Sequence, residues 1–533
     1  MTDDIVIRGG EVVDGTGAPA RRADVALSGG RIAEIGRDVA ASGARVIDAK
    51  GCMVAPGFID IKTHSDWTLP LAPRAESKIF QGVATEVIGH CGFSCAPCLP
   101  GKSAALKQYL GPSAPWLDFK DTSFADYAAT YPATAVNRVM LVGHNTLRLM
   151  VMGMEDRPPS PSELERMTRL LSESLAAGAY GLSSGLFTPP GAYATGEEMV
   201  ELGRTLKRFG APYFTHLRDE ANRVFDAVEE AIEFGAKTGV HVQIVHAKVS
   251  GTDNWGKAER FIERLREARR QGVAIDCDEY PYGAASNPLR NLMPPWLQEG
   301  GVDAMLARLG DPSVRTRIRA EIDAQGLNNF GRIPGWQAIR ISISPNLPHY
   351  AGKTIAEIAR DGDKDPFEAA LDYIVADRGQ TRVLVDSIAE DDIRAFIAAP
   401  DVMVGSDGNS VAPTGTTGQG KPHPRFYGTF ARILGRYVRE LGVVALETAI
   451  RKMTGASAAA LGLADRGLIR ERFRADVTVF DPASIAERAT YEDPHRFADG
   501  VRSVVVNGVP VLLAGEHTGA TPGQMVRRQG VPT

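Results

Sequence analysis

The stretch PYFTHLRDEANRVFDAVEEAIEFGAKTGVHVQIVHAK, residues 212–248, predicts one strand–helix–strand unit. Residues 212–217 and 241–248 are short apolar runs that suit strands. Residues 224–239 lie between them with the apolar spacing of a helix, and this segment ends at a glycine, which commonly caps a helix. A helix between two strands at this spacing is typical of parallel β/α units. The stretch therefore predicts a parallel sheet covered by helices.

The same alternation of strand and helix continues on both sides of this stretch. The predicted strand 137–146 precedes the predicted helix 160–178, strand 179–186 precedes helix 195–210, and strand 241–248 precedes helix 256–272. A further strand follows at 274–282. We therefore expect an α/β fold, a distorted (β/α)8 TIM barrel with insertions. A doubly wound parallel sheet is the alternative. It is weakened because no glycine-rich nucleotide-binding fingerprint follows a strand.

Both ends of the chain are rich in β-branched residues punctuated by glycine. The pairs Gly29-Gly30 and Asn507-Gly508 each separate two strand-like runs, which is a strong hairpin signal. We expect a small β-sandwich domain formed by both termini around a central barrel. The first part of the sandwich is expected at residues 1–55, the barrel at 56–465, and the second part of the sandwich with the C-terminal tail at 466–533. Within the barrel, residues 283–350 or thereabouts are rich in Pro, Gly and Asn, and we expect them to form a lid-like insertion.

Composition narrows the classes of partner. The formal net charge of the 533-residue chain is −5, so nucleic acid is not an expected partner. No apolar run is long enough for a membrane span, and the N-terminus lacks the basic and apolar regions of a signal peptide, so we expect a cytoplasmic protein. Five cysteines are too few for a disulfide framework in a chain of this length. The expected partner is a small-molecule substrate; the sequence leaves the oligomeric state open, a homo-oligomer included.

Titratable residues follow several of the predicted strands. In APGFIDIKTHSDWTLP, residues 55–70, the strand Phe58–Ile61 runs directly into Lys62 and His64. In a β/α barrel the carboxyl ends of all strands face one mouth, where active sites lie. Residues far apart in the sequence can therefore meet there. The other candidates at strand ends are His90, Cys91, His144, His216, His246 and Asp407.

This set of side chains suits a divalent metal, and zinc best of all. A thiolate, neutral imidazoles and a carboxylate are ligands for zinc, which lowers the pKa of bound water and polarises a carbonyl. A nearby carboxylate can then move the water's proton to a leaving nitrogen, which is metal-assisted hydrolysis. Taken singly, a histidine at a strand end is more often a hydrogen-bonded core residue, and a lone Cys91 is more often packing. For His144 two interpretations are equally supported: it lies behind the metal ligands and supports them, or it only packs in the core.

The motifs occur in an order that resembles one family. The chain resembles the amidohydrolase superfamily and, within it, the D-aminoacylases (N-acyl-D-amino-acid deacylases), over nearly its whole length. The terminal β segments look like the two parts of the superfamily's sandwich. The successive site motifs that carry the resemblance are PGFID, GHCGFS, YFTHLRDE, VHAK, EYPYGAAS, GSDG and HPRFYGTF.

The resemblance implies roles for individual residues. In that family a tightly bound zinc is held by a cysteine and two histidines, which match Cys91, His216 and His246, and the aspartate after the eighth strand is the general base, which matches Asp407. The superfamily's H-x-H pair, which supplies a second metal site, reads Lys62-x-His64 here. Because a charged lysine is a poor metal ligand, one zinc per chain is expected.

The role of Lys62 stays open among three interpretations. Its charge could stand where a second cation would have been, it could orient Asp407 or a substrate carboxylate, or it could pair with Asp60 or Asp66. His64 is the remaining histidine of the H-x-H pair. It is expected either to belong to a second metal site or to lie behind the ligands of the first metal site.

The resemblance also implies a substrate and its contacts. Arg425 resembles a residue that grips the substrate's α-carboxylate, a task that suits a bidentate guanidinium. Tyr282 and Lys248 resemble further pocket residues, and Thr188 stands where the family often has a tyrosine. The implied enzyme is a zinc-dependent hydrolase that cleaves the amide bond of N-acyl-D-amino acids to a carboxylate and a free D-amino acid. The alternatives are an amidohydrolase for a cyclic amide, imide or lactone, and a non-catalytic ligand-binding barrel.

Overall fold

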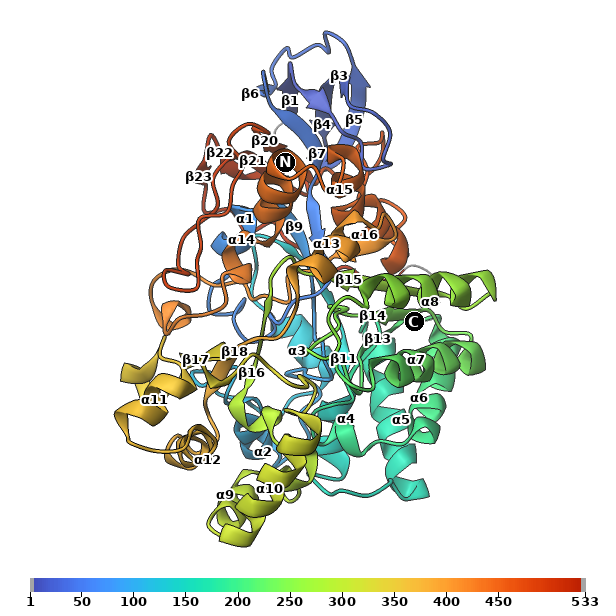
Figure 1. Cartoon of the computed structure of the whole chain (residues 1–533). Helices are drawn as coiled ribbons and strands as arrows, with labels where there is room; N and C mark the ends of the chain where they lie inside the picture. The colour runs from blue at the N-terminus through green and yellow to red at the C-terminus, as the bar shows by residue number, and fades with distance from the viewer. Residues whose placement is uncertain (1–3, 529–533) are drawn as a thin grey trace.

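The two ends of the chain meet in a pair of sheets. The computed structural model describes residues 4–528 (Figure 1). The first sheet has the order β5-β4-β1-β6, and the second, β23-β22-β21-β20-β7-β2-β3, combines strands from both ends. The bounds of the first are β1 Ile5–Arg8, β4 Asp24–Ser28, β5 Arg31–Gly36 and β6 Arg45–Asp48; those of the second are β2 Glu11–Val12, β3 Arg21–Arg22, β7 Met53–Pro56, β20 Val477–Phe480, β21 Val501–Val506, β22 Val509–Leu513 and β23 Glu516–His517.

Antiparallel pairing between β7 and β20 joins the ends of the chain, as the sequence led us to expect. Apolar side chains from both sheets fill one core, including Ile7, Val25, Val54 and Val477. The turn between β4 and β5 is the Gly29-Gly30 pair, whose positive φ angles of 56° and 76° suit glycine.

A series of short parallel strands occupies the centre of the molecule (Figure 1). One sheet has the order β10-β9-β8, and the next has the order β11-β12-β13-β14-β15-β19. Their bounds are β8 Phe58–Asp60, β9 Val83–Ile88, β10 Asn137–Met140, β11 Val142–Gly143, β12 Leu182–Gly185, β13 Tyr213–His216, β14 Val242–Ile244, β15 Ile275–Glu279 and β19 Val402–Val404. A parallel bridge between Thr63 and Gly408 links the segment after β8 to the segment after β19.

Helices lie between these strands and cover them. They are α1 Glu76–Ile79, α2 Ser103–Leu110, α3 Phe124–Thr130, α4 His144–Val151, α5 Pro161–Ala176, α6 Gly196–Phe209, α7 Val224–Thr238, α8 Ala258–Arg270, α13 Glu390–Ala398, α14 Arg425–Arg432, α15 Leu446–Met453 and α16 Gly455–Leu461. Local sequence sets their ends: Ser160 and Glu163 form a capping box on α5, and Gly210 closes α6 in the left-handed conformation. The largest apolar core lies between these helices and the strands.

A separate small sheet stands beside the parallel strands (Figure 1, yellow-green). Its order is β16-β18-β17, all antiparallel, with the bounds β16 Ala284–Pro288, β17 Ile339–Ile343 and β18 Arg382–Asp386. Helices α9 Val302–Leu309, α10 Pro312–Gln325, α11 Ile355–Asp361 and α12 Pro366–Ala376 pack with it around their own apolar core. The unit therefore runs to Asp386, beyond the expected 283–350, because α11, α12 and β18 lack the Pro and Gly content that marked the insertion.

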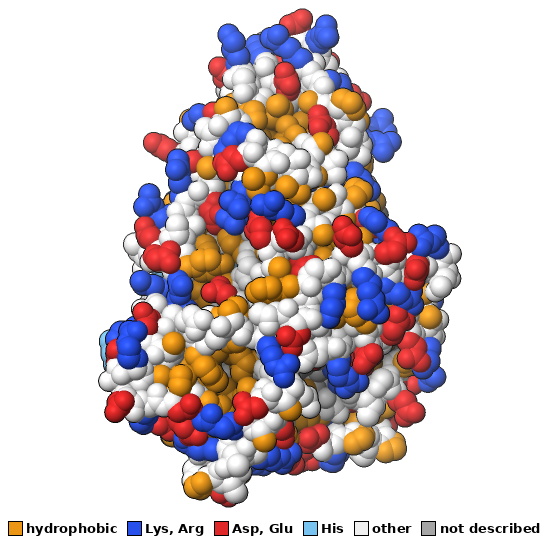
Figure 2. All heavy atoms as spheres, in the orientation of Figure 1, with side chains coloured by type: hydrophobic (Ala, Val, Ile, Leu, Met, Phe, Trp, Pro, Cys, Tyr) orange, Lys and Arg blue, Asp and Glu red, His pale blue; other side chains and the backbone are white. Residues whose placement is uncertain are grey.

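The surface carries mixed charge. Figure 2 shows acidic and basic side chains interspersed over one face, with smaller apolar areas between them. Within residues 4–528, no helix has the length and hydropathy needed to cross a lipid bilayer.

Candidate metal centre and active site

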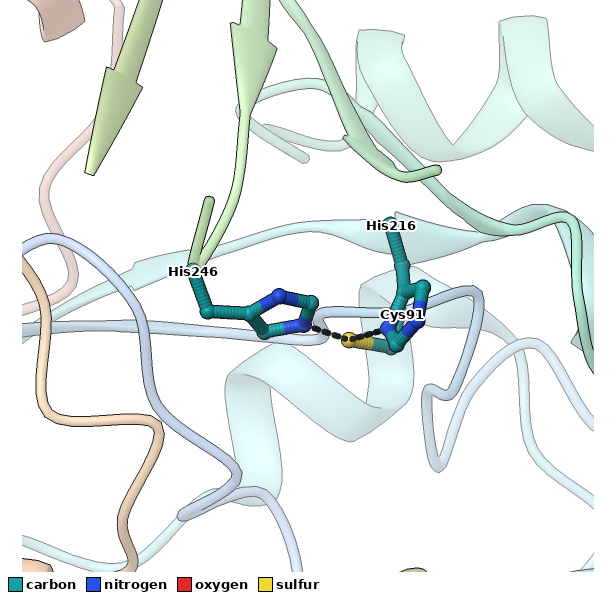
Figure 3. A group of neighbouring side chains, drawn as sticks. All are labelled: Cys91, His216 and His246. Carbon is teal, nitrogen blue, oxygen red and sulfur yellow. Dashed lines mark hydrogen bonds between the residues drawn. The ribbon is translucent and has the colours of Figure 1, made fainter. Parts of the chain in front are cut away.

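Three buried side chains from three strand ends point at one another (Figure 3). Cys91 follows β9, His216 ends β13 and His246 follows β14. The Cys91 Sγ lies 3.6 Å from His216 Nδ1 and 3.3 Å from His246 Nε2. All three donor atoms lie within 4.8 Å of one another. The structure thus brings together the three residues that the sequence singled out as ligands.

The donor set fits zinc. One sulfur and two imidazole nitrogens are the atoms that zinc prefers, and a set of three leaves a position for water or substrate. Burial lowers the pKa of His216, so its imidazole is neutral, which is the form that binds a metal. Burial raises the pKa of the Cys91 thiol to about 12, so the charge of a bound cation is needed to make the thiolate.

Glu220 lies behind both histidines. Its Oε2 is 3.3 Å from His216 Nε2, and its Oε1 is 3.1 Å from His246 Nδ1, so it contacts the ring nitrogens that face away from Cys91. Lys248 Nζ donates to Glu220 Oε1 at 2.7 Å, and Asn329 Nδ2 donates to Oε2 at 3.0 Å. A carboxylate in this place fixes the orientation and tautomer of metal-binding imidazoles.

Sequence reasoning missed both Glu220 and Asn329. Glu220 lies in the YFTHLRDE motif four residues after His216, and a carboxylate at that distance from a ligand histidine was a usable signal. Asn329 belongs to the segment between β16 and β17, far from any recognised motif, so nothing local marked it.

Asp407 is held by three cationic or polar partners. Lys62 Nζ donates to Asp407 Oδ1, His64 Nε2 lies 3.3 Å from the same oxygen, and Arg425 Nη2 lies 2.8 Å from Oδ2. Burial raises the Asp407 pKa, but the charges of Arg425 and Lys62 outweigh burial and hold it well below its usual range. Asp407 is therefore a carboxylate that can accept a proton.

The pairing of Lys62 favours one of the three interpretations given above. Its ion pair among the described residues is with Asp407, whereas Asp60 pairs with Lys78 Nζ at 2.7 Å. Lys62 is fully buried, and its Nζ lies 2.7 Å from His64 Nε2. Lys62 thus orients Asp407 with its charge directly beside the remaining histidine of the H-x-H pattern.

Three site residues have an uncommon backbone conformation. The φ angles of Cys91, His246 and Asp407 are 56°, 40° and 50°, in the left-handed region that non-glycine residues seldom adopt. Such conformations persist where surrounding structure enforces them, and they cluster at functional sites. Each strand end turns sharply here, which aims the side chain inward.

The two tyrosines of the EYPYG motif point to different partners. Tyr282 donates its hydroxyl to Glu487 Oε1 at 2.7 Å, away from the ligand cluster. Tyr280 is the tyrosine beside the two proposed substrate cations: the Arg425 guanidinium carbon lies 4.7 Å from the centre of its ring, and Lys248 Nζ lies 5.5 Å from it. The Tyr280 hydroxyl is buried, with no hydrogen-bond partner in the described part of the chain.

Other candidates lie outside the ligand cluster. His144 Nε2 lies 2.7 Å from Glu198 Oε1 in a buried network, and His90 packs its ring edge-on against Phe214. Thr188 uses its carbonyl to accept from Asn145, while its neighbour Phe187 stacks on the His216 ring with 4.1 Å between ring centres. Phe187 is thus the residue of this loop that touches a ligand.

A small cavity of about 30 Å³ lies over the ligands, with room for one or two water molecules. Its walls include the three ligands, Asp407 and His64, and also Arg382 from β18. No motif marked Arg382 in the sequence, because it reaches the site from the small antiparallel sheet.

Comparison with known proteins agrees with this geometry. The amidohydrolase family matches residues 45–512. The chain is 36% identical to a D-aminoacylase from Alcaligenes xylosoxydans xylosoxydans, over 98% of both chains. It is 37% identical to an N-acyl-D-aspartate deacylase from the same organism, over 98% of this chain and 95% of the relative.

Solved structures give the same result. The crystal structure of D-aminoacylase matches with a TM-score of 0.83 at 35% identity, over 99% of this chain and 100% of that one. The N-acyl-D-glutamate deacylase from Bordetella bronchiseptica, solved with zinc and a phosphonate mimic of the tetrahedral intermediate, matches with a TM-score of 0.81 at 33% identity, over the same shares. The helices and parallel sheets described above are thus those of amidohydrolases, and the chain belongs to the amidohydrolase family.

Proposed function

We propose that the protein is a zinc-dependent hydrolase that cleaves the amide bond of N-acyl-D-amino acids, releasing a carboxylate and a free D-amino acid. The observation that carries the proposal is the cluster of Cys91, His216 and His246 with its donor atoms within 4.8 Å of one another. Similarity to D-aminoacylase and N-acyl-D-aspartate deacylase over 98% of the chain supports the same reaction.

One zinc ion per chain is assigned to Cys91, His216 and His246. When bound, zinc polarises a carbonyl and lowers the pKa of water. The single ion is supported by Lys62, whose ammonium group occupies the space between His64 and Asp407. A second cation there would be repelled by that charge.

Asp407 is the general base of this proposal. Its carboxylate takes a proton from the attacking water and delivers it to the nitrogen of the scissile amide, which leaves as the amine. Lys62 and Arg425 each hold one of its oxygens, so the carboxylate is both ionised and fixed in direction.

Arg425, Lys248 and Tyr280 are assigned to the substrate's α-carboxylate. Both cations lie near the Tyr280 ring, and the Tyr280 hydroxyl, which has no partner in the described residues, supplies a hydrogen-bond donor. Arg425 contacts Asp407 through Nη2, while its Nε and Nη1 have no hydrogen-bond partner in the described part of the chain, so the guanidinium has N–H groups free for a substrate carboxylate while it holds Asp407.

The proposed architecture is a distorted (β/α)8 barrel over residues 56–465, with a small β-sandwich of residues 1–55 and 466–533. The parallel pairings from β8 to β19 and the bridge between Thr63 and Gly408 support the barrel. The core shared by the two terminal sheets supports the sandwich.

Hydrolysis of matched N-acetyl-D- and N-acetyl-L-amino acids tests the function. Zinc-loaded protein is assayed with Met, Leu, Phe and Glu derivatives, and with hydantoins and dihydropyrimidines for the cyclic alternative. Turnover of the D series alone is expected. Asp407→Asn should lower kcat by on the order of 10²–10⁴. No turnover of any D derivative by protein with verified zinc, or an Asp407→Asn variant with most of its kcat, would overturn the proposal.

A further inference from the structure

Arg382 brings an additional cation to the wall of the active-site cavity. It is the first residue of β18, where it pairs with Pro288 of β16. Its guanidinium is held by hydroxyl and carbonyl groups: Nε donates to Ser286 Oγ at 2.9 Å, Nη2 to the Ser286 carbonyl at 3.2 Å, and Nη1 to Ser113 Oγ at 2.7 Å. Three neutral contacts therefore fix its direction without neutralising its charge.

The other cations of the site have anionic partners, and Arg382 does not. Lys248 pairs with Glu220, and both Lys62 and Arg425 pair with Asp407. Asp407 forms its ion pairs with Lys62, His64 and Arg425, and none of the ion pairs found within residues 4–528 involves Arg382. Removing an unpaired guanidinium from bulk water is unfavourable, and proteins seldom retain such a group without an anion to bind.

The electrostatic surroundings of Arg382 favour the binding of an anion. Burial and the nearby charge of Arg425 together lower its pKa to about 10, against the opposing effect of Asp407. The Arg382 guanidinium therefore stays charged at neutral pH, and the positive charge of Arg425 repels it. An arriving carboxylate would relieve that repulsion.

A substrate with a single α-carboxylate leaves this charge unsatisfied. The α-carboxylate is assigned to Arg425, Lys248 and Tyr280, so Arg382 needs a second anionic group. We infer that Arg382 selects substrates that carry a second carboxylate, and that the protein acts on acidic N-acyl-D-amino acids in preference to neutral ones. This inference rests on the proposed function and deepens it.

The second carboxylate can lie on the amino-acid side chain, as in D-aspartate or D-glutamate, or on the acyl group, as in an N-succinyl amide. Both present the planar anion that a guanidinium binds through two parallel hydrogen bonds. In either case the cavity of about 30 Å³ has to open, since it holds only one or two waters.

The wild-type protein gives the first test, with pairs of substrates that differ in charge but hardly in shape. N-acetyl-D-glutamate is compared with N-acetyl-D-glutamine, N-acetyl-D-aspartate with N-acetyl-D-asparagine, and N-succinyl-D-leucine with N-acetyl-D-leucine. At least one acidic member should exceed its partner in kcat/KM by about 100-fold or more, the range for a buried charge pair. The pair that shows the difference identifies which part of the substrate carries the carboxylate.

Variants give the second test. Arg382→Gln should lower kcat/KM for the preferred acidic substrate by about 100-fold, mainly through KM, and should change the neutral partner less than about threefold. Arg382→Lys should restore part of the preference, because it keeps the charge but not the planar fork. Arg340→Gln, on the neighbouring strand β17, is the matched control and should leave every ratio unchanged. Zinc content and melting temperature verify that each variant is folded.

The outcomes distinguish a failure of the Arg382 inference from a failure of the proposed deacylase function. Equal turnover of acidic and neutral D substrates by the wild type, or an equal loss for both in Arg382→Gln, overturns the role of Arg382 and leaves the deacylase reaction intact. No turnover of any D substrate overturns the proposed function itself.

Discussion

At the scale of single residues, charged groups behind the candidate ligands and the candidate base set their geometry. Glu220 faces the outer nitrogens of both His216 and His246, so one carboxylate sets two ligands at once. Lys62 plays a comparable part for Asp407 and also lies against His64. Both residues are fully enclosed by protein, where each charge acts at low effective dielectric.

Glu220→Gln should weaken zinc binding by about 10- to 100-fold, because the amide cannot accept from both imidazoles as a carboxylate does. Competition against a chelating dye measures the zinc affinity directly, without reference to activity. Glu230→Gln is the control, since Glu230 pairs with Arg218 at the partly exposed edge of the neighbouring helix. Unchanged zinc affinity in Glu220→Gln would show that Glu220 only fills space.

Lys62→His should raise the zinc content from one to two ions per chain. The substitution removes a buried positive charge and restores the H-x-H pattern beside Asp407. Metal analysis after dialysis gives the stoichiometry, and Lys62→Met, which removes the charge without adding a ligand, should stay at one. If Lys62→His also binds a single ion, the charge of Lys62 is not what limits the metal count.

At the scale of elements, the site is built where strand ends pack closely against one another. The Cys91-Gly92 turn after β9 lies directly against the end of β11, and a Cβ built on Gly143 would lie 2.1 Å from the Gly92 carbonyl oxygen. Only glycine allows these two segments to approach so closely. The position of Cys91 therefore depends on a residue that takes no part in the chemistry.

Gly143→Ala should lower the free energy of unfolding by about 1–3 kcal/mol, the usual cost of overpacking, and should weaken zinc binding by displacing Cys91. Denaturant unfolding and zinc competition measure the two effects. Gly196→Ala is the matched control, since no atom beyond its own helix lies within 4 Å of the added methyl group. A Gly143→Ala protein as stable as Gly196→Ala would refute the close packing.

At the scale of the whole molecule, one buried cation far from the site should shape the pH dependence of stability. Lys452 of α15 is enclosed among backbone carbonyls and donates to Phe396 O at 3.1 Å and to Ile397 O. Burial lowers its pKa to about 7, whereas in the unfolded chain it stays near 10.5. Between these values the unfolded chain binds more protons, so stability rises with pH.

The stability of the wild type relative to Lys452→Met should therefore increase between pH 7 and pH 10, by at most about 1.4 kcal/mol per pH unit. At pH 7 and below, the cost of the buried charge is fully present, and the methionine variant has its largest advantage. Denaturant titrations of both proteins at several pH values check the slope. If the stabilities of the wild type and Lys452→Met change in parallel between pH 7 and pH 10, the pKa of Lys452 is not lowered in the folded protein.

Much of the site was predictable because its residues follow strands that the local pattern identifies. His216 and His246 end two successive strand-like runs, and parallel strands place such ends together. Tyr282 and its neighbour Tyr280 have the same local sequence pattern, and only the structure separates them: Tyr280 lies beside Arg425, whereas Tyr282 donates to Glu487. Asn329 and Arg382 were not predictable, since both reach the site from the small sheet and its loops.

The sequence by itself determined the family and the alternation of strands and helices, and it singled out Cys91, His216 and His246, which the structure brings together. These follow from short-range patterns, such as apolar periodicity, caps and motif order. The tertiary structure alone decided that Lys62 pairs with Asp407, that Glu220 supports both histidines, and that Arg382 lines the cavity. Those facts depend on contacts between residues as far as 345 positions apart, which only the packing of the whole chain creates.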